Sequence, residues 1–98
     1  MQTNIRALEQ RQPGSEHLRR YGETARMLTG NATATSGDCV PWARKLVADL
    51  SIPNLRRYGI ASCHITELVE KASKANSMKA NPIVLTPEEL ARTLEAAM

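Results

Sequence analysis

The chain has 98 residues, a formal net charge of +3, two cysteines, a single tryptophan and no phenylalanine. A chain of this length forms one domain or part of one, which excludes a multi-domain organisation. The Arg19-Arg20 and Arg56-Arg57 pairs are separated by acidic residues. They do not form the continuous basic stripe expected of a nucleic-acid-binding protein.

The apolar residues are mostly Leu, Ile, Val, Ala and Met, and this aliphatic set favours packed helices over a sheet. No basic stretch leads into an apolar run near Met1, and no run is long enough to span a bilayer. Without a secretory signal, Cys39 and Cys63 are expected to be reduced thiols. We therefore expect an all-α, cytoplasmic protein with no membrane partner.

Glycine and proline divide the chain into about five helical segments. The first is a short helix over residues 4–10. The second begins after Pro13-Gly14 with Ser15 as its N-cap and ends at Gly30, a residue suited to the position just past a helix.

Residues 31–37 are small and polar, which predicts an exposed loop. Asp38 is expected to cap the third helix, because this places Pro41 in the first turn, where its missing N–H breaks no helical hydrogen bond. Helical spacing then predicts one broad apolar face made of Cys39, Trp42, Ala43, Leu46, Val47 and Leu50.

Ile52-Pro53 ends this helix. The apolar residues on either side of Gly59, namely Leu55, Tyr58 and Ile60, are expected to contact one another across a turn, and we call this contact the apolar clasp. Ser62 is the predicted cap of a fourth helix that closes near Asn76, with inward positions at Ile65, Leu68, Val69 and Ala72.

A loop over residues 77–82 precedes the last helix. There Thr86 is the N-cap, Pro87 is the first helical residue and Glu89 reaches back to the cap. Leu85 and Leu90 flank this capping box as a hydrophobic staple.

The residues able to hold a metal or act as a nucleophile are few: His17, Cys39, Cys63 and His64. Neighbours such as Cys63 and His64 point about 100° apart on a helix and do not chelate one ion easily. We expect both histidines at the surface and both cysteines to be small buried hydrophobic residues. The Glu88-Glu89 pair is explained by helix capping, and no glycine-rich phosphate loop is present. The sequence thus assigns no catalytic, cofactor-binding or metal-binding residue.

From Tyr21 to the end, the chain resembles the C-terminal tail of the iron-containing (group III) alcohol dehydrogenase family. The resemblance rests on the order and spacing of short matches, namely Tyr21, Ala25–Gly30, Trp42, Leu46, Leu50, Ile52–Leu55, Tyr58–Ile60, Ser77–Ile83, Leu85-Thr86 and Glu88–Leu90. It implies an incomplete part of the helical C-terminal domain of the dehydroquinate-synthase-like fold, spanning residues 1–98.

The family resemblance implies a parent enzyme that transfers hydride between NAD or NADP and a small alcohol or aldehyde, using Fe²⁺ or Zn²⁺ held by one Asp and three His. No position here matches those ligands or the nucleotide loop, so no cofactor is expected in this chain and no activity from it alone. Its expected partners are the parent's upstream domains, with self-association through uncovered apolar faces. The segment Ser77–Pro82 could face the substrate cleft or be a structural turn. The alternative is a stand-alone helical module that binds a protein or nucleic acid.

Overall fold

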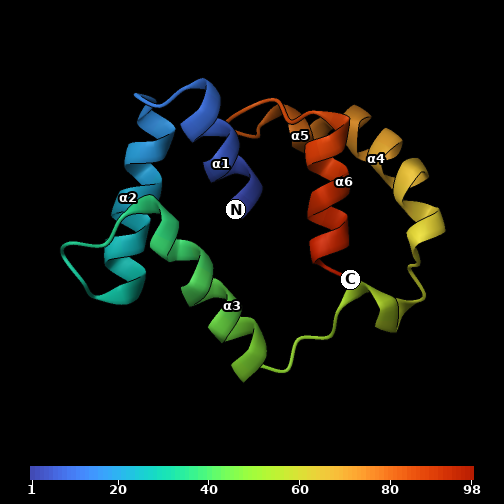
Figure 1. The fold of residues 1–98 in the computed structure, drawn as a ribbon, viewed down its shortest axis with the longest axis horizontal. Helices are drawn as coiled ribbons and strands as arrows, with labels where there is room; N and C mark the ends of the chain where they lie inside the picture. Colours follow the sequence, from blue (N-terminus) through green and yellow to red (C-terminus); the bar gives the residue numbers. More distant parts are fainter. The chain divides into compact units, whose positions relative to one another are not determined.

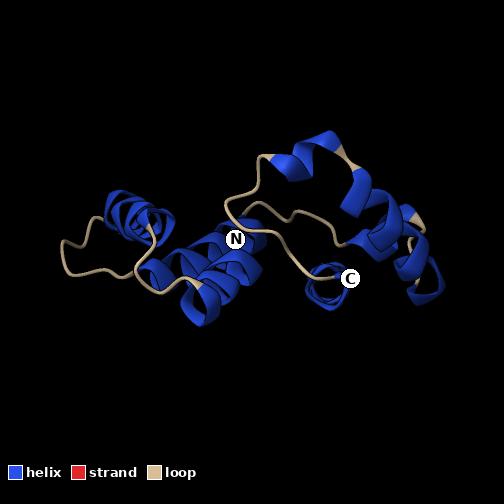
Figure 2. Cartoon of the chain, turned by 90° about the horizontal axis from the view of Figure 1, so that it is seen from above, coloured by secondary structure: helices blue, strands red, loops and turns tan.

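The structure is a computed structural model that describes every residue from Met1 to Met98. It contains six α-helices, three short 3-10 helices and no strand (Figure 2). The predicted all-α class is confirmed, and the prediction of about five helices was one short. The chain forms two compact units, Met1–Ile52 and Pro53–Met98, and each is described by itself.

The first unit contains α1 (Gln2–Arg11), α2 (Glu16–Thr29), the 3-10 helix η1 (Ser36–Asp38) and α3 (Cys39–Asp49) (Figure 1). Helix α1 is longer than the predicted 4–10, because its first turn closes on Met1, whose carbonyl accepts a hydrogen bond from the Ile5 amide. Ile5, Ala7 and Leu8 are buried. The short helix therefore depends on tertiary contacts, which an isolated helix of this length would need.

Both predicted ends of α2 are confirmed. The Ser15 hydroxyl accepts a hydrogen bond from the His17 amide at 3.0 Å. Gly30 takes the left-handed conformation, with φ of 68°, just past the last helical residue. A glycine suits this position because it has no Cβ to clash with the carbonyl.

Small side chains let the start of α3 approach α2. Ala25, Ala34 and Cys39 form one buried cluster, and the Cys39 thiol donates to the Tyr21 carbonyl at 3.3 Å. The core of this unit is consequently made of small residues and a few aliphatic side chains on α1.

The predicted cap at Asp38 was wrong. Its backbone is already helical (φ −70°, ψ −16°), whereas Thr35 is extended (φ −103°, ψ 170°) and starts the 3-10 turn that leads into α3. An N-cap residue has a non-helical backbone. The Asp38 carboxylate instead reaches back to accept a hydrogen bond from the Thr35 amide at 2.7 Å.

The predicted apolar face of α3 is only partly covered. Cys39 is buried, Trp42 and Ala43 are half-buried, and the rest of the face is exposed. Leu46, Val47, Leu50 and the following Ile52 are 40%, 44%, 62% and 52% exposed, respectively. In Figure 1 the C-terminal end of α3 extends past α2.

Helix α3 ends in a Schellman-type turn at a residue that is not glycine. The Ile52 amide bonds the Val47 carbonyl and the Ser51 amide bonds the Ala48 carbonyl, each at 3.0 Å. Ser51 has φ of 53°, the one non-glycine residue in the left-handed region. A side chain at such a position costs about 1–2 kcal/mol.

The second unit contains the 3-10 helices η2 (Leu55–Tyr58) and η3 (Ser62–His64), followed by α4 (Ile65–Lys74), α5 (Asn76–Lys79) and α6 (Pro87–Ala96). Helices α4 and α6 pack against each other. Only Ile83, Glu89 and Leu90 are buried in this unit, while the predicted inward residues of α4 are half-buried.

The predicted cap at Ser62 was wrong for the same reason as at Asp38. Ser62 lies inside η3, and the extended Ala61 precedes it (φ −120°, ψ 168°). The Ala61 amide donates to Nδ1 of His64 at 3.0 Å, so an imidazole supplies the acceptor that we expected from a serine hydroxyl.

The predicted apolar clasp around Gly59 is only partly formed. Leu55 and Ile60 are half-buried, but Tyr58 is 69% exposed.

The predicted capping box at Thr86 is confirmed. The Thr86 hydroxyl accepts from the Glu89 amide at 3.2 Å, and the Glu89 carboxylate accepts from the Thr86 amide at 2.9 Å. Pro87 is the first helical residue.

The first and last segments of the second unit are joined by a backbone hydrogen bond. Beyond the end of α6, the Ala97 carbonyl accepts this bond from the Leu55 amide at 2.9 Å.

Candidate functional site

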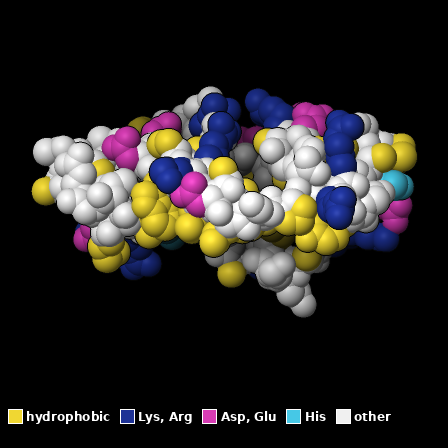
Figure 3. Space-filling view, turned by 90° about the horizontal axis from the view of Figure 1, so that it is seen from below, with side chains coloured by type: hydrophobic (Ala, Val, Ile, Leu, Met, Phe, Trp, Pro, Cys, Tyr) yellow, Lys and Arg dark blue, Asp and Glu magenta, His cyan; other side chains and the backbone are white.

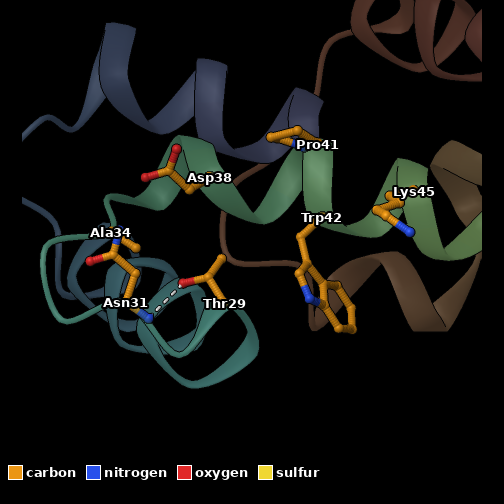
Figure 4. A pocket seen from close by; sticks show the side chains of 7 residues that line it. All are labelled: Thr29, Asn31, Ala34, Asp38, Pro41, Trp42 and Lys45. Carbon is orange, nitrogen blue, oxygen red and sulfur yellow. Dashed lines mark hydrogen bonds between the residues drawn. The ribbon is translucent and has the colours of Figure 1, made fainter.

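A pocket in the first unit lies between one face of α3 and the segment that follows α2 (Figure 4). Its volume is about 380 Å³. We call it the Trp42 pocket. Its lining residues are Thr29, Asn31, Ala34, Asp38, Pro41, Trp42 and Lys45.

The α3 wall follows from helical spacing. Asp38, Trp42 and Lys45 stand at positions i, i+4 and i+7, which share one side of a helix. In Figure 4 the Trp42 ring projects from α3 toward the side on which Thr29 and Asn31 lie. The only indole of the protein therefore lines a pocket.

The opposite wall is a hydrogen-bonded turn. The Thr29 hydroxyl donates to the Ala25 carbonyl at 2.7 Å and accepts from the Asn31 amide at 3.2 Å. The Asn31 side-chain oxygen accepts from both the amide and the hydroxyl of Thr33, at 2.9 and 2.8 Å. These bonds fix this wall, and the Asn31 side-chain oxygen already accepts two of them.

The two charged residues of the pocket have different surroundings. The Asp38 carboxylate accepts from the Thr35 amide and hydroxyl at 2.7 and 3.3 Å, and in Figure 4 it points away from the Trp42 ring. The Lys45 ammonium pairs with Asp49 at 2.6 Å, and both side chains of this pair are more than half exposed. An exposed pair of this kind is weak, so the ammonium can still bind another group.

The residues first considered for metal or nucleophilic chemistry do not come together. His17 and His64 are exposed, as expected, and belong to different units. No three His, Cys, Asp or Glu side chains are grouped closely enough to hold a metal ion.

The two cysteines have different surroundings. Both are free thiols, as expected. Cys39 is buried, and its burial raises the pKa of the thiol. Cys63 is exposed, so the prediction that both would be buried was wrong for Cys63. Its place in η3, ahead of α4, leaves it outside the packed face of that helix.

Segment Ser77–Pro82 is not the continuous loop that we expected. Residues Asn76–Lys79 form the single helical turn α5, which begins after the extended Ala75. The Asn81 amide donates to the Met78 carbonyl at 3.1 Å, and the Asn81 side chain donates to the Ile83 carbonyl at 2.7 Å. Asn81 thus shapes a turn that leads into the buried Ile83. A contact of this segment with substrate stays a prediction.

A second surface feature is the uncovered part of the α3 face. We call Leu46, Val47, Leu50 and Ile52 the α3 apolar row. Hydrophobic side chains lie at the surface beside basic ones in the space-filling view (Figure 3). Exposed apolar side chains close together in the chain, such as those of this row, are typical of surfaces that another protein segment covers.

Sequence reasoning placed Trp42 on an apolar face but did not single out the pocket. The spacing of Asp38, Trp42 and Lys45 in the sequence predicts that they share one side of a helix. That residues 29–34 pack against this side depends on the tertiary fold, which the sequence pattern does not show.

No protein-family model, no curated protein and no solved structure matches this chain. None of its helices is both long and apolar enough to cross a membrane.

Proposed function

We propose that this chain is a helical part of a metal-dependent alcohol dehydrogenase of the iron-containing family, and that it works by packing against the other domains of that enzyme. The observation that supports this proposal is the α3 apolar row, which leaves four aliphatic side chains at the C-terminal end of α3 and just beyond it between 40% and 62% exposed. The sequence resemblance supplies the parent enzyme.

The chain's own residues do not fit the metal that the resemblance implies. His17 and His64 lie in different units, and no set of three possible ligands is grouped. A catalytic site of this type needs about three converging protein ligands. In the proposed enzyme the metal and nucleotide sites therefore belong to the upstream domains, and this chain contributes packing that closes the helical domain.

Fragment complementation tests the proposal. An iron-containing alcohol dehydrogenase truncated before its last helices is mixed with this chain, and reduction of NAD or NADP by short alcohols is followed by absorbance. We expect activity only in the mixture. The double variant Leu46→Glu, Leu50→Glu should abolish the rescue, because charge on the row opposes burial.

Met27→Glu is the matched control, because Met27 is an exposed apolar residue (76%) on another helix of the same unit. It should leave the rescue intact. Absence of rescue, with no binding of the truncated enzyme by the chain, would contradict the proposal.

The second candidate is a stand-alone helical module that binds another protein through the same α3 apolar row. The exposure of Leu46, Val47, Leu50 and Ile52 supports it equally, because such a row can be covered by any complementary protein segment. Nucleic acid is a less suitable partner: the adjacent exposed arginines form two short pairs, Arg19-Arg20 and Arg56-Arg57, and the first pair forms ion pairs with Glu16. DNA binding that falls steeply with salt would reverse this order.

A further inference from the structure

We propose that the Trp42 pocket binds a small organic acid, a carboxylate attached to a planar aromatic body. This inference goes beyond the packing role proposed above, because it concerns a small-molecule ligand of the Trp42 pocket and not the covering of the apolar row. It rests on the size of the pocket, on its aromatic wall and on the balance of hydrogen-bond donors and acceptors around it.

The size and walls of the pocket fit a small planar molecule. A volume of about 380 Å³ lies within the range of small-molecule sites, about 300–1,000 Å³. The indole of Trp42 offers a flat apolar surface, and Pro41 and Ala34 add apolar contacts. Aromatic rings prefer offset or edge-to-face contact with such a surface. A single-ring body satisfies these walls.

Several hydrogen-bond donors among the lining residues have no partner within the chain. No hydrogen bond within the chain involves the Trp42 indole N–H or the side-chain amide of Asn31 as donor, while the Asn31 oxygen already accepts two bonds. The Lys45 ammonium has three N–H donors, of which Asp49 uses one. Donors around an apolar surface are complementary to an acceptor group on the ligand.

The placement of charge selects an anion over a cation. A cationic ligand would need the Asp38 carboxylate to face the indole. Figure 4 shows that carboxylate turned away from the Trp42 ring. One of its oxygens accepts hydrogen bonds from the Thr35 amide and hydroxyl. Lys45 is the only cation among the lining residues. One ammonium matches a single carboxylate, whereas a phosphate is usually met by several donors or basic groups.

Trp42 provides a direct readout, because it is the only tryptophan and gives the only indole N–H signal in a proton–nitrogen correlation spectrum. The full chain is titrated with benzoate, with the neutral benzamide and with the cationic benzylamine, all of similar shape. We expect saturable movement of the indole signal with benzoate, and affinities about five-fold weaker or lower for the other two.

The Lys45→Met variant should lower benzoate affinity to that of benzamide, and Lys45→Arg should retain most of it. Lys71→Met is the matched control, because Lys71 forms the same kind of exposed i to i+4 pair, with Glu67 at 2.5 Å in the other unit. It should leave the benzoate titration unchanged, and the dispersion of amide signals reports whether each variant is folded.

Three results would overturn the proposal. The first is no saturable shift up to the solubility limit of benzoate. The second is benzylamine binding as tightly as benzoate, which would make Asp38 the dominant charge. The third is a folded Lys45→Met variant with unchanged benzoate affinity.

Discussion

The hydroxyl of Thr86 and the carboxylate of Glu89 each accept a hydrogen bond from the other residue's amide, at 3.2 and 2.9 Å. The Thr86 hydroxyl thereby satisfies one of the amides that have no partner within the first turn of a helix. Thr86→Ala should lower the free energy of unfolding by about 1 kcal/mol. Urea denaturation followed by circular dichroism measures it.

Thr66→Ala is the control for that variant, because Thr66 is an exposed threonine inside α4 rather than at a cap. Alanine has the higher helix propensity, so this change should leave stability equal or slightly raised. Equal denaturation midpoints for the two variants would show that the Thr86 hydroxyl does not stabilise α6.

Ser51 is a site where glycine should improve stability. Its φ of 53° is costly for a residue with a Cβ, and glycine adopts this conformation freely. Ser51→Gly should raise the free energy of unfolding by up to about 1 kcal/mol. Ser73→Gly, within the right-handed helix α4, should instead lower it by roughly 0.5 kcal/mol. Thermal melting of both variants tests the opposite signs.

The Glu67 carboxylate should titrate below its usual range. The Lys71 ammonium hydrogen-bonds it and lowers its pKa, with a smaller contribution from the charge of Lys71. A lowered folded-state pKa means that this stabilisation is present above the unfolded pKa near 4.5 and is lost as pH falls through the folded value. Carbon-detected titration should show the Glu67 pKa rising in Lys71→Met. An identical titration curve in that variant would exclude the ion pair as the cause.

The two thiols should differ in reactivity. Cys39 is fully buried and burial raises its pKa, whereas Cys63 is exposed. Because thiolates are the reactive species, an alkylating reagent at pH 8 should modify Cys63 first and Cys39 only on unfolding. Mass spectrometry of timed digests identifies the modified residue. Equal rates at the two positions in the folded protein would contradict the packing of Cys39 against α2.

The α3 apolar row should cause the isolated chain to self-associate, because apolar side chains without cover favour contact with another copy. Sedimentation at high micromolar concentration should show species larger than a monomer. Leu50→Glu should shift the distribution toward monomer, whereas Met27→Glu should leave it unchanged. A monomeric wild-type chain that binds no hydrophobic dye would remove the basis for this expectation.

Local chemistry decided which structural features were predictable. The caps at Ser15 and Thr86 and the stop at Gly30 follow from a few neighbouring residues, and all three are present. Asp38 and Ser62 also have cap-forming side chains, but the residue with the extended backbone lies three positions before Asp38 and one before Ser62. Side-chain type alone therefore did not identify where each turn begins.

Exposure along α3 was less predictable than the helix itself. The spacing of its apolar residues is the same whether the face is covered or not, so only the tertiary contacts show that Leu46 and Leu50 are exposed. The Trp42 pocket shows the same limit. Helical spacing places Trp42 and Lys45 on one side of α3, but the wall at Thr29 and Asn31 comes from the path of the chain.

The hydrogen bond from the Leu55 amide to the Ala97 carbonyl holds the two ends of the second unit together, so that the path of its backbone forms a nearly closed ring. A short flexible peptide linking residue 98 to residue 53 would close this ring with little loss of conformational entropy. The unit could then be opened elsewhere, for example at the exposed Lys79-Ala80 turn, to give a circular permutant with the same helices in a new order. For the same reason, a bulky group fused directly to Met98 would crowd Leu55, so a label on this unit is better attached at Cys63.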